Sequence, residues 1–171
     1  MKKIMKDFKS IFSSETDTVP GDIPVYSPAY GEAIVLAEVN DPVFSEGIMG
    51  TGCAILPEQG ELYSPVSGEV TALFPTYHAI GINGDHGEEI LLHIGVNTVE
   101  MNGEGFTPFV KKGDRVDVGT LLIKFDLQLI KEKRYDPDIM VILLNSNDYK
   151  GISFEPKRIQ CGEALFSVKS S

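Results

Sequence analysis

The seven-residue stretch Tyr63-Ser64-Pro65-Val66-Ser67-Gly68-Glu69 repeats, with two changes, the earlier stretch Tyr26-Ser27-Pro28-Ala29-Tyr30-Gly31-Glu32. Each copy leads into a short apolar run, at residues 33–36 and 70–74. Proline and glycine at the same places in both copies are typical of tight turns that lead into strands. The repetition predicts a duplicated β unit packed on itself, because two copies are too few for a solenoid.

The rest of the chain has the same organisation. Further apolar runs, such as residues 90–96 and 120–125, are separated by turns that contain glycine and proline, and a looser repeat relates residues 116–122 to 159–166. This spacing predicts an all-β fold, an antiparallel sandwich or barrel with short helical turns. The best helix candidate, residues 126–134, is short.

The length of 171 residues fits one domain with a sizeable core. We assign residues 23–171 to this domain and residues 1–22 to a flexible tail, because residues 13–22 are polar and acidic and include a Pro-Gly pair. In residues 1–12, apolar side chains recur at helical spacing among lysines. This pattern predicts weak contact with an anionic membrane surface, and a frayed tail is the alternative.

The composition excludes several classes of function. A net charge of −10 argues against nucleic acid as a partner. The N-terminus lacks the apolar stretch of a secretory signal, and no run approaches the ~18 apolar residues of a membrane span, so we expect a cytoplasmic protein. Cys53 and Cys161 lack CxxC spacing and are expected to be reduced, packed thiols, and no zinc site is expected from two cysteines and three histidines.

Two histidines in apolar segments point to a site. His93 interrupts the run 90–96, and His78 comes just before a second apolar segment. A titratable ring in such a place is either hydrogen-bonded and inert or held for chemistry. The third histidine, His86, lies in a turn and is expected to be solvated. We also expect Glu88 and Glu89 on the surface.

Residues 87–99 resemble the signature around the phosphorylated histidine of the glucose-type IIA component of the bacterial phosphoenolpyruvate-dependent sugar phosphotransferase system. That signature reads Gly, two variable residues, three apolar residues, His, apolar, Gly, apolar, variable, Thr, and Val or Ala, and every position is met. Thr76, His78 and Ala79 match the segment that carries the family's second histidine. The likeness covers about residues 26–168.

The resemblance implies a β-sandwich of the duplicated hybrid motif type, in agreement with the repeats. It also implies that His93 is phosphorylated at Nε2, that His78 hydrogen-bonds the phosphoryl group and that Thr76 orients the His78 ring. The phosphoryl donor would be the phosphohistidine of the small carrier protein HPr. The acceptor would be a cysteine on the IIB domain of a sugar permease, and no cofactor or metal is required.

The resemblance further implies an apolar docking surface around the site, which both partners use in turn. Its members would be Val43, Phe44, Phe74, Ile80, Leu91 and Val99. Asn97 stands beside it where many relatives carry aspartate, which removes one negative charge. We expect a monomer that also regulates other proteins through its phosphorylation state, and the sequence does not name the sugar.

The chemistry of such a relay sets its own requirements. A histidine accepts a phosphoryl group only on a neutral, free ring nitrogen, and the other nitrogen is best held by a backbone carbonyl. Gly95, which lacks Cβ, would let the backbone approach the anion closely. Met49, Met101 and Met140 are interpreted as packing residues.

Three alternatives remain open at this point. A zinc peptidase of the lysostaphin-like type needs a His-x-His pair, but Leu91 stands two residues before His93. Residues 110–119 resemble the turn of biotinyl or lipoyl carrier domains, yet no lysine has the setting of a modified one, and Lys124 falls in an expected strand. A non-enzymatic regulator would use the same docking surface, as an added role.

Overall fold

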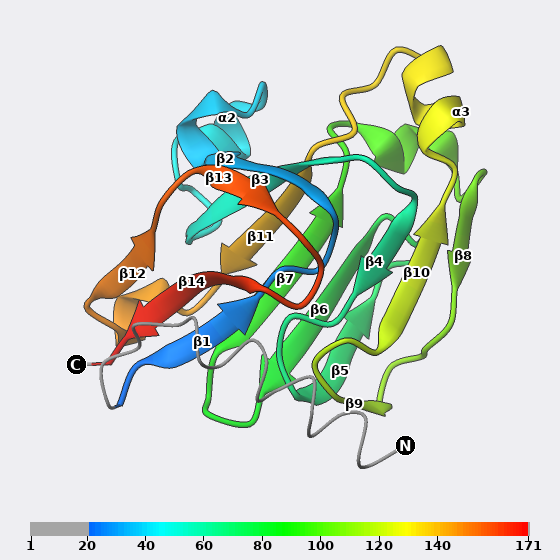
Figure 1. The fold of residues 1–171 in the computed structure, drawn as a ribbon. Coiled ribbons are helices and arrows are strands. Elements are labelled where there is room, and N and C mark those ends of the chain that lie inside the picture. The colour runs from blue at the N-terminus through cyan, green and yellow to red at the C-terminus, as the bar shows by residue number, and fades with distance from the viewer. Residues whose placement is uncertain (1–20, 171) are drawn as a thin grey trace.

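The structure, a computed structural model, describes residues 21–170. Its strands form one eight-stranded sheet and two three-stranded sheets. Every pairing within these sheets is antiparallel. Figure 1 shows the two small sheets side by side in front of the large one. The predicted all-β antiparallel sandwich is confirmed, and the large sheet ends in edge strands and does not close into a barrel.

The elements have the following bounds. The large sheet runs in the order β13 (Lys157–Ile159), β2 (Gly31–Val35), β3 (Thr51–Pro57), β11 (Ile139–Leu143), β7 (Glu89–Ile94), β6 (Ala79–Gly84), β5 (Gly68–Leu73), β9 (Arg115–Val116). One small sheet has the order β1 (Ile23–Tyr26), β14 (Ala164–Lys169), β12 (Gly151–Phe154), and the other β4 (Glu61–Tyr63), β10 (Leu121–Phe125), β8 (Phe106–Pro108). The helices are α2 (Pro42–Ser45) and α3 (Leu127–Glu132), with 3-10 turns at Leu36–Glu38, Thr98–Met101 and Ser146–Asp148.

The predicted helix is confirmed as α3, and its start has a local cause. Asp126 precedes it, and the Asp126 carboxylate accepts the backbone N–H of Leu129 at 3.0 Å. Such a cap satisfies one of the amide donors that a helix start leaves unpaired. The helix has its C-cap at Lys133, and Arg134 follows in the left-handed conformation with φ of 66°.

The seven-residue repeat is confirmed as a structural duplication. Each copy links a strand of a small sheet to a strand of the large sheet, β1 to β2 and β4 to β5. The copies bond to each other reciprocally: the Tyr26 N–H donates to Pro65 at 3.0 Å, and the Tyr63 N–H to Pro28 at 2.8 Å. In both copies the serine after the tyrosine donates its hydroxyl to the carbonyl two residues later, at 2.7 Å.

The looser repeat follows the same symmetry. The Gly162 N–H donates to the Ser27 carbonyl at 3.0 Å, and the Gly119 N–H donates to the Ser64 carbonyl at 2.9 Å. The large sheet therefore contains equivalent strands at equal distances from its centre, namely β11 with β7, β3 with β6, β2 with β5 and β13 with β9. His93 lies on one of the two central strands.

Both faces of the central strands are covered, which explains the continuous apolar run in β7. Ile90, Leu92 and Ile94 belong to the main core, together with side chains of both small sheets. Leu91 points to the other face and packs in a smaller cluster with Phe44 of α2. His93 follows Leu91 by two residues, so strand alternation puts the imidazole on the face that α2 covers.

No helix within residues 21–170 is long and apolar enough to cross a membrane. Residues 1–20 lie outside the part of the chain that the structure describes. The predicted tail 1–22, its membrane contact through residues 1–12 and the domain boundary at residue 23 therefore stay predictions.

Candidate active site

The His93 ring is half-buried at the end of β7, and two neighbours fix its orientation. Its Nδ1 lies 2.8 Å from the Gly95 carbonyl oxygen. The Phe44 ring lies against it, with 4.9 Å between ring centroids. Because a carbonyl only accepts, Nδ1 carries the proton and Nε2 is left as a free acceptor. The backbone carbonyl that the sequence analysis required is therefore present.

The structure brings His78 and His93 together, as predicted. Their ring centroids are 4.9 Å apart, and the two planes meet edge to face at 78°. His78 lies one residue before β6, and the pairing of Ala79 with His93 aligns the two strands at this point. The Thr76 hydroxyl lies 2.5 Å from His78 Nδ1. If this hydroxyl donates, the His78 proton is on Nε2.

Burial controls the protonation of both rings. Desolvation and the neighbouring His78 lower the pKa of His93 to about 4, against smaller opposite effects of the Gly95 carbonyl and Asp41. Desolvation also lowers the pKa of His78, which is 5% exposed. Both imidazoles are therefore neutral at pH 7, and a neutral ring is the form that a nucleophilic histidine needs.

Only part of the predicted docking surface is exposed. Val43, Phe74 and Val99 are exposed by 43%, 41% and 48%. Asn97 is also exposed, and it adopts the left-handed conformation with φ of 63°. The Phe74 ring packs edge-on against His78, with centroids 5.6 Å apart. Phe74 therefore contacts the site directly, and a docking role for Val43, Asn97 and Val99 stays a prediction.

The other three predicted docking residues require correction. Ile80 is fully buried in the main core, so it is excluded from any docking surface in this structure. Leu91 and Phe44 are each only 5% exposed and pack in the smaller core. Phe44 still contributes to the site, but as the wall that holds the His93 ring. The alternation of strand faces cannot reveal that α2 covers the second face.

Sequence reasoning missed the cap beside the site and an exposed apolar residue in the turn after α2. Asp41 caps α2 through a 3.0 Å bond from the Val43 N–H, and its charge raises the pKa of His93 against the effect of burial. Ile48 is exposed by 66% in the turn after α2. The Asp-Pro pair at 41–42, a helix-start signal, could have revealed the cap. No periodic pattern marks Ile48.

Further expectations from the sequence were wrong. Glu88 is 1% exposed, although it was expected on the surface, and Met49 is 37% exposed, although it was expected to pack inside. Met101 and Met140 are buried as expected.

Gly95 has φ of +78°, and a Cβ there would lie 2.3 Å from the Thr98 side chain. The turn geometry therefore requires glycine at this position, whether or not an anion approaches.

The alternatives gain little support. Within residues 21–170, no group of three histidine, cysteine or acidic side chains is arranged to hold a metal ion. The expectation that no cofactor is required stays a prediction. Lys124 lies in β10, as expected, and its ammonium sits 5.5 Å from the centre of the Phe109 ring. It is therefore not at the tip of a hairpin, where carrier domains have their modified lysine.

Comparison with known proteins identifies the family and agrees with the fold. Residues 23–149 match the family described as phosphoenolpyruvate-dependent sugar phosphotransferase system, EIIA 1. The glucose permease IIA of Mycoplasma capricolum has a similar structure, with a TM-score of 0.77 and 32% identity, over 89% of this chain and 99% of that one.

Two curated relatives are longer proteins. The beta-glucoside-specific EIIBCA component of Bacillus subtilis is 48% identical over 148 residues, which cover 84% of this chain and 24% of the relative. The component of the same name from Dickeya chrysanthemi is 45% identical over 131 residues, 77% of this chain and 21% of that protein. The chain thus spans about a quarter of the length of these relatives.

Proposed function

Because this chain belongs to the EIIA 1 family of the phosphoenolpyruvate-dependent sugar phosphotransferase system, whose members take part in phosphoryl transfer, we propose that it carries the phosphoryl group on His93 Nε2. The observation that carries this proposal is the bond between His93 Nδ1 and the Gly95 carbonyl. It leaves the lone pair of Nε2 free on a ring that burial keeps neutral. The attack forms a bond from Nε2 to phosphorus while the bond to the donor nitrogen breaks.

His78 has a separate role in the proposal. If Thr76 donates to His78 Nδ1, the opposite nitrogen presents its N–H toward the space beside His93. That N–H would donate to an oxygen of the phosphoryl group and stabilise its charge. Phosphoryl transfer depends mainly on such positioning and charge stabilisation. The proposal therefore includes no metal and no cofactor.

The partners follow from the family and its relatives. We propose that the phosphohistidine of HPr is the donor and that a cysteine of a IIB domain is the acceptor, since the EIIBCA relatives join the A part to B and C parts in one chain. In the second step the cysteine thiolate attacks phosphorus and His93 leaves as the neutral ring. The exposed Val43, Phe74 and Val99 would contact both partners in turn, and any regulatory targets as well. Such a relay would operate in the cytoplasm.

The test is reconstitution of both steps of the relay, acceptance by His93 and delivery to a IIB domain. The chain is incubated with phosphoenolpyruvate, Enzyme I and HPr, and the His93 peptide is analysed by mass spectrometry at neutral pH. We expect a phosphoryl group on His93, and none on the His93→Gln variant. The His78→Gln variant should accept the group but pass it to a IIB domain about 100-fold more slowly, as for loss of a transition-state donor.

The control is Lys150→Gln, which makes the same kind of substitution on an exposed turn before β12. It should accept and pass the phosphoryl group as the unmodified chain does. A phosphorylated His93→Gln variant would overturn the assignment of the acceptor. Transfer from His78→Gln at the unmodified rate would refute the role of His78.

A further inference from the structure

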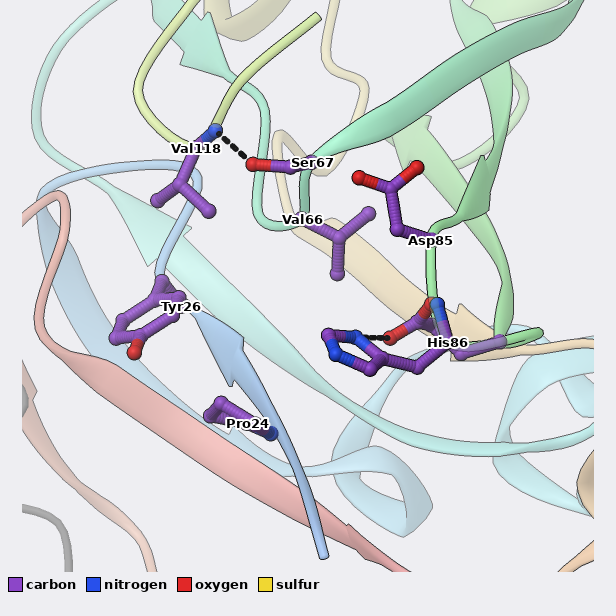
Figure 2. A pocket seen from close by; sticks show the side chains of 8 residues that line it. Pro24, Tyr26, Val66, Ser67, Asp85, His86 and Val118 are labelled. Atoms are coloured by element: carbon purple, nitrogen blue, oxygen red, sulfur yellow. Dashed lines mark hydrogen bonds and ion pairs between the residues drawn. The ribbon is translucent and has the colours of Figure 1, made fainter. Parts of the chain in front are cut away.

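A hollow of about 230 Å³ opens on the surface between four segments of the chain. In Figure 2 the Tyr26 and His86 rings lie on different sides of it, and Val66 lies above the His86 ring. The lining residues are Pro24, Tyr26, Val66, Ser67, Asp85, His86, Glu88 and Val118. They come from β1, the turn of the second repeat, the β6–β7 turn and the segment before β10.

The hollow contains a buried carboxylate that the proposed relay does not use. Glu88 is 1% exposed, and its Oε1 accepts the His86 backbone N–H at 3.0 Å. Its other oxygen, Oε2, lies 3.8 Å from His86 Nδ1, which is longer than a hydrogen bond. Burial raises the pKa of Glu88, and no lysine or arginine among the described residues pairs with it. A cation at Oε2 would compensate this charge.

The rest of the lining favours a cation on an apolar stem. The Tyr26 ring, Val66 and Val118 add carbon surface to the same lining. An aromatic face also attracts a cation. The second acid of the lining, Asp85, forms an ion pair with Arg115 at the rim. Within the hollow the Glu88 carboxylate therefore faces only the His86 ring, 3.8 Å away, and no lysine or arginine of residues 21–170 pairs with it.

We propose that this hollow binds a small primary amine, with its ammonium group at Glu88 Oε2 and its carbon chain against Tyr26, Val66 and Val118. A guanidinium group prefers both oxygens of a carboxylate, but here the His86 N–H occupies one of them. An ammonium group needs one acceptor per hydrogen bond, so it fits the single available oxygen. The volume suits a stem of a few carbons.

The hollow is separate from the histidine pair. Both lie at the β6–β7 hairpin, but Ala79 pairs with His93 at one end and Asn83 pairs with Glu89 at the other. Four residues of strand separate the two pairings, a distance of about 13 Å. An amine in the hollow therefore leaves the surface around His93 free, and this proposal does not depend on the phosphoryl relay.

The experiment is a titration of the full ¹⁵N- and ¹³C-labelled chain with n-butylammonium chloride, followed by NMR. We expect saturable shifts of the Tyr26 and His86 amides and of the Glu88 side-chain carbon, and little change at His93. n-Butanol, which has the same stem without the charge, should give no saturable shift.

Two variants test the role of the carboxylate. Glu88→Gln keeps an acceptor for the His86 N–H but removes the charge, and it should weaken binding at least about tenfold, as for loss of a charged hydrogen bond. His86→Ala removes the ring next to Oε2 and should retain binding. Equal binding to Glu88→Gln, or saturable binding of n-butanol, would overturn the proposal. If Glu88→Gln fails to fold, an unmoved Glu88 carbon signal in the unmodified chain overturns it as well.

Discussion

At the scale of single residues, the His93 ring combines two properties that usually oppose each other. It is buried enough to stay neutral, yet one nitrogen remains available at the surface. The Gly95 carbonyl makes this possible, because it fixes the proton on Nδ1 without adding a charge. A carboxylate in its place would raise the pKa of the ring and favour the cation.

The lowered pKa of His93 predicts a pH effect on stability. The unfolded chain binds a proton at this ring near the ordinary pKa of 6.5, whereas the folded chain binds it only near a pKa of about 4. Protonation therefore favours the unfolded state as the pH falls from 6.5 to 4. Through this group alone, the free energy of unfolding should fall by about 3 kcal/mol over that range.

Urea unfolding of the unmodified chain and of His93→Gln, measured from pH 8 to pH 4, checks this prediction. The variant lacks the titrating ring, so its stability should depend less steeply on pH below 6.5. The imidazole ¹⁵N signals of His93 should also report a neutral ring at pH 5. Parallel stability curves for the two proteins would contradict the burial of a neutral His93.

Residues also show where sequence reasoning reaches its limit. The proximity of His78 and His93 was predictable, because each lies beside an apolar run that reads as a strand. The conformation of Tyr77 was not, since φ of 59° at a tyrosine has no local signal. It depends on the turn in which the Tyr77 N–H donates to the Phe74 carbonyl at 2.8 Å. The burial of Glu88 likewise depends on tertiary contacts that no pattern of charges encodes.

At the scale of elements, α2 is a very short helix for an element that positions the site. It contains four residues, and its cap Asp41 provides both the bond to Val43 and a charge that acts on His93. The two effects can be separated by mutation. Asparagine caps a helix about as well as aspartate but carries no charge.

We predict that Asp41→Asn leaves the stability nearly unchanged and lowers the pKa of His93 further, since the attractive charge is lost. Asp41→Ala should lower the pKa in the same way and also cost about 1 kcal/mol of stability through loss of the cap. Thermal melting and ¹⁵N titration of the ring measure the two effects. An unchanged His93 titration in Asp41→Asn would show that the charge does not reach the ring.

The strands were more predictable than the way in which they are covered. The apolar runs at 33–36, 70–74, 90–96 and 120–125 predicted β2, β5, β7 and β10 to within two residues at each end. A run of apolar residues, however, is the same whether one face or both faces are buried by neighbours. The family resemblance assigned Ile80 and Leu91 to a docking surface, and the apolar runs could not correct it, because they do not show that the main core and the α2 cluster cover the two faces.

At the scale of the whole molecule, the two ends of the described segment lie next to each other. Ile23 pairs with Val168 in the β1–β14 ladder, and the Ser170 N–H lies 3.4 Å from the Asp22 carboxylate. The link between β3 and β4 at Gln59 is exposed. A cut there would leave each of the two related sets of strands continuous in sequence.

We predict that a circular permutant, which joins residue 170 to residue 21 by a short Gly-Ser linker and opens between Gln59 and Gly60, folds to the same structure. Its melting temperature should lie within a few degrees of that of the uncut 21–170 chain, because adjacent ends add little loop entropy. Near-UV circular dichroism and thermal melting test this. A permutant opened within β7, between Leu91 and Leu92, should not fold. Equal behaviour of the two permutants would contradict this view of the sheet.

The symmetry of the large sheet has a consequence for the number of phosphoryl acceptors at its centre. Gly52 of β3 and Ala79 of β6 are equivalent positions in the two halves of the sheet. Each stands the same number of residues before the strand residue that pairs with its repeat glycine. Their neighbours on the central strands are Ile142 and His93. The twin of the acceptor is thus a hydrocarbon side chain without a lone pair. Under the proposed relay each chain holds one phosphoryl group at a time on His93. The overall transfer rate therefore depends on how quickly the donor protein dissociates before the acceptor binds.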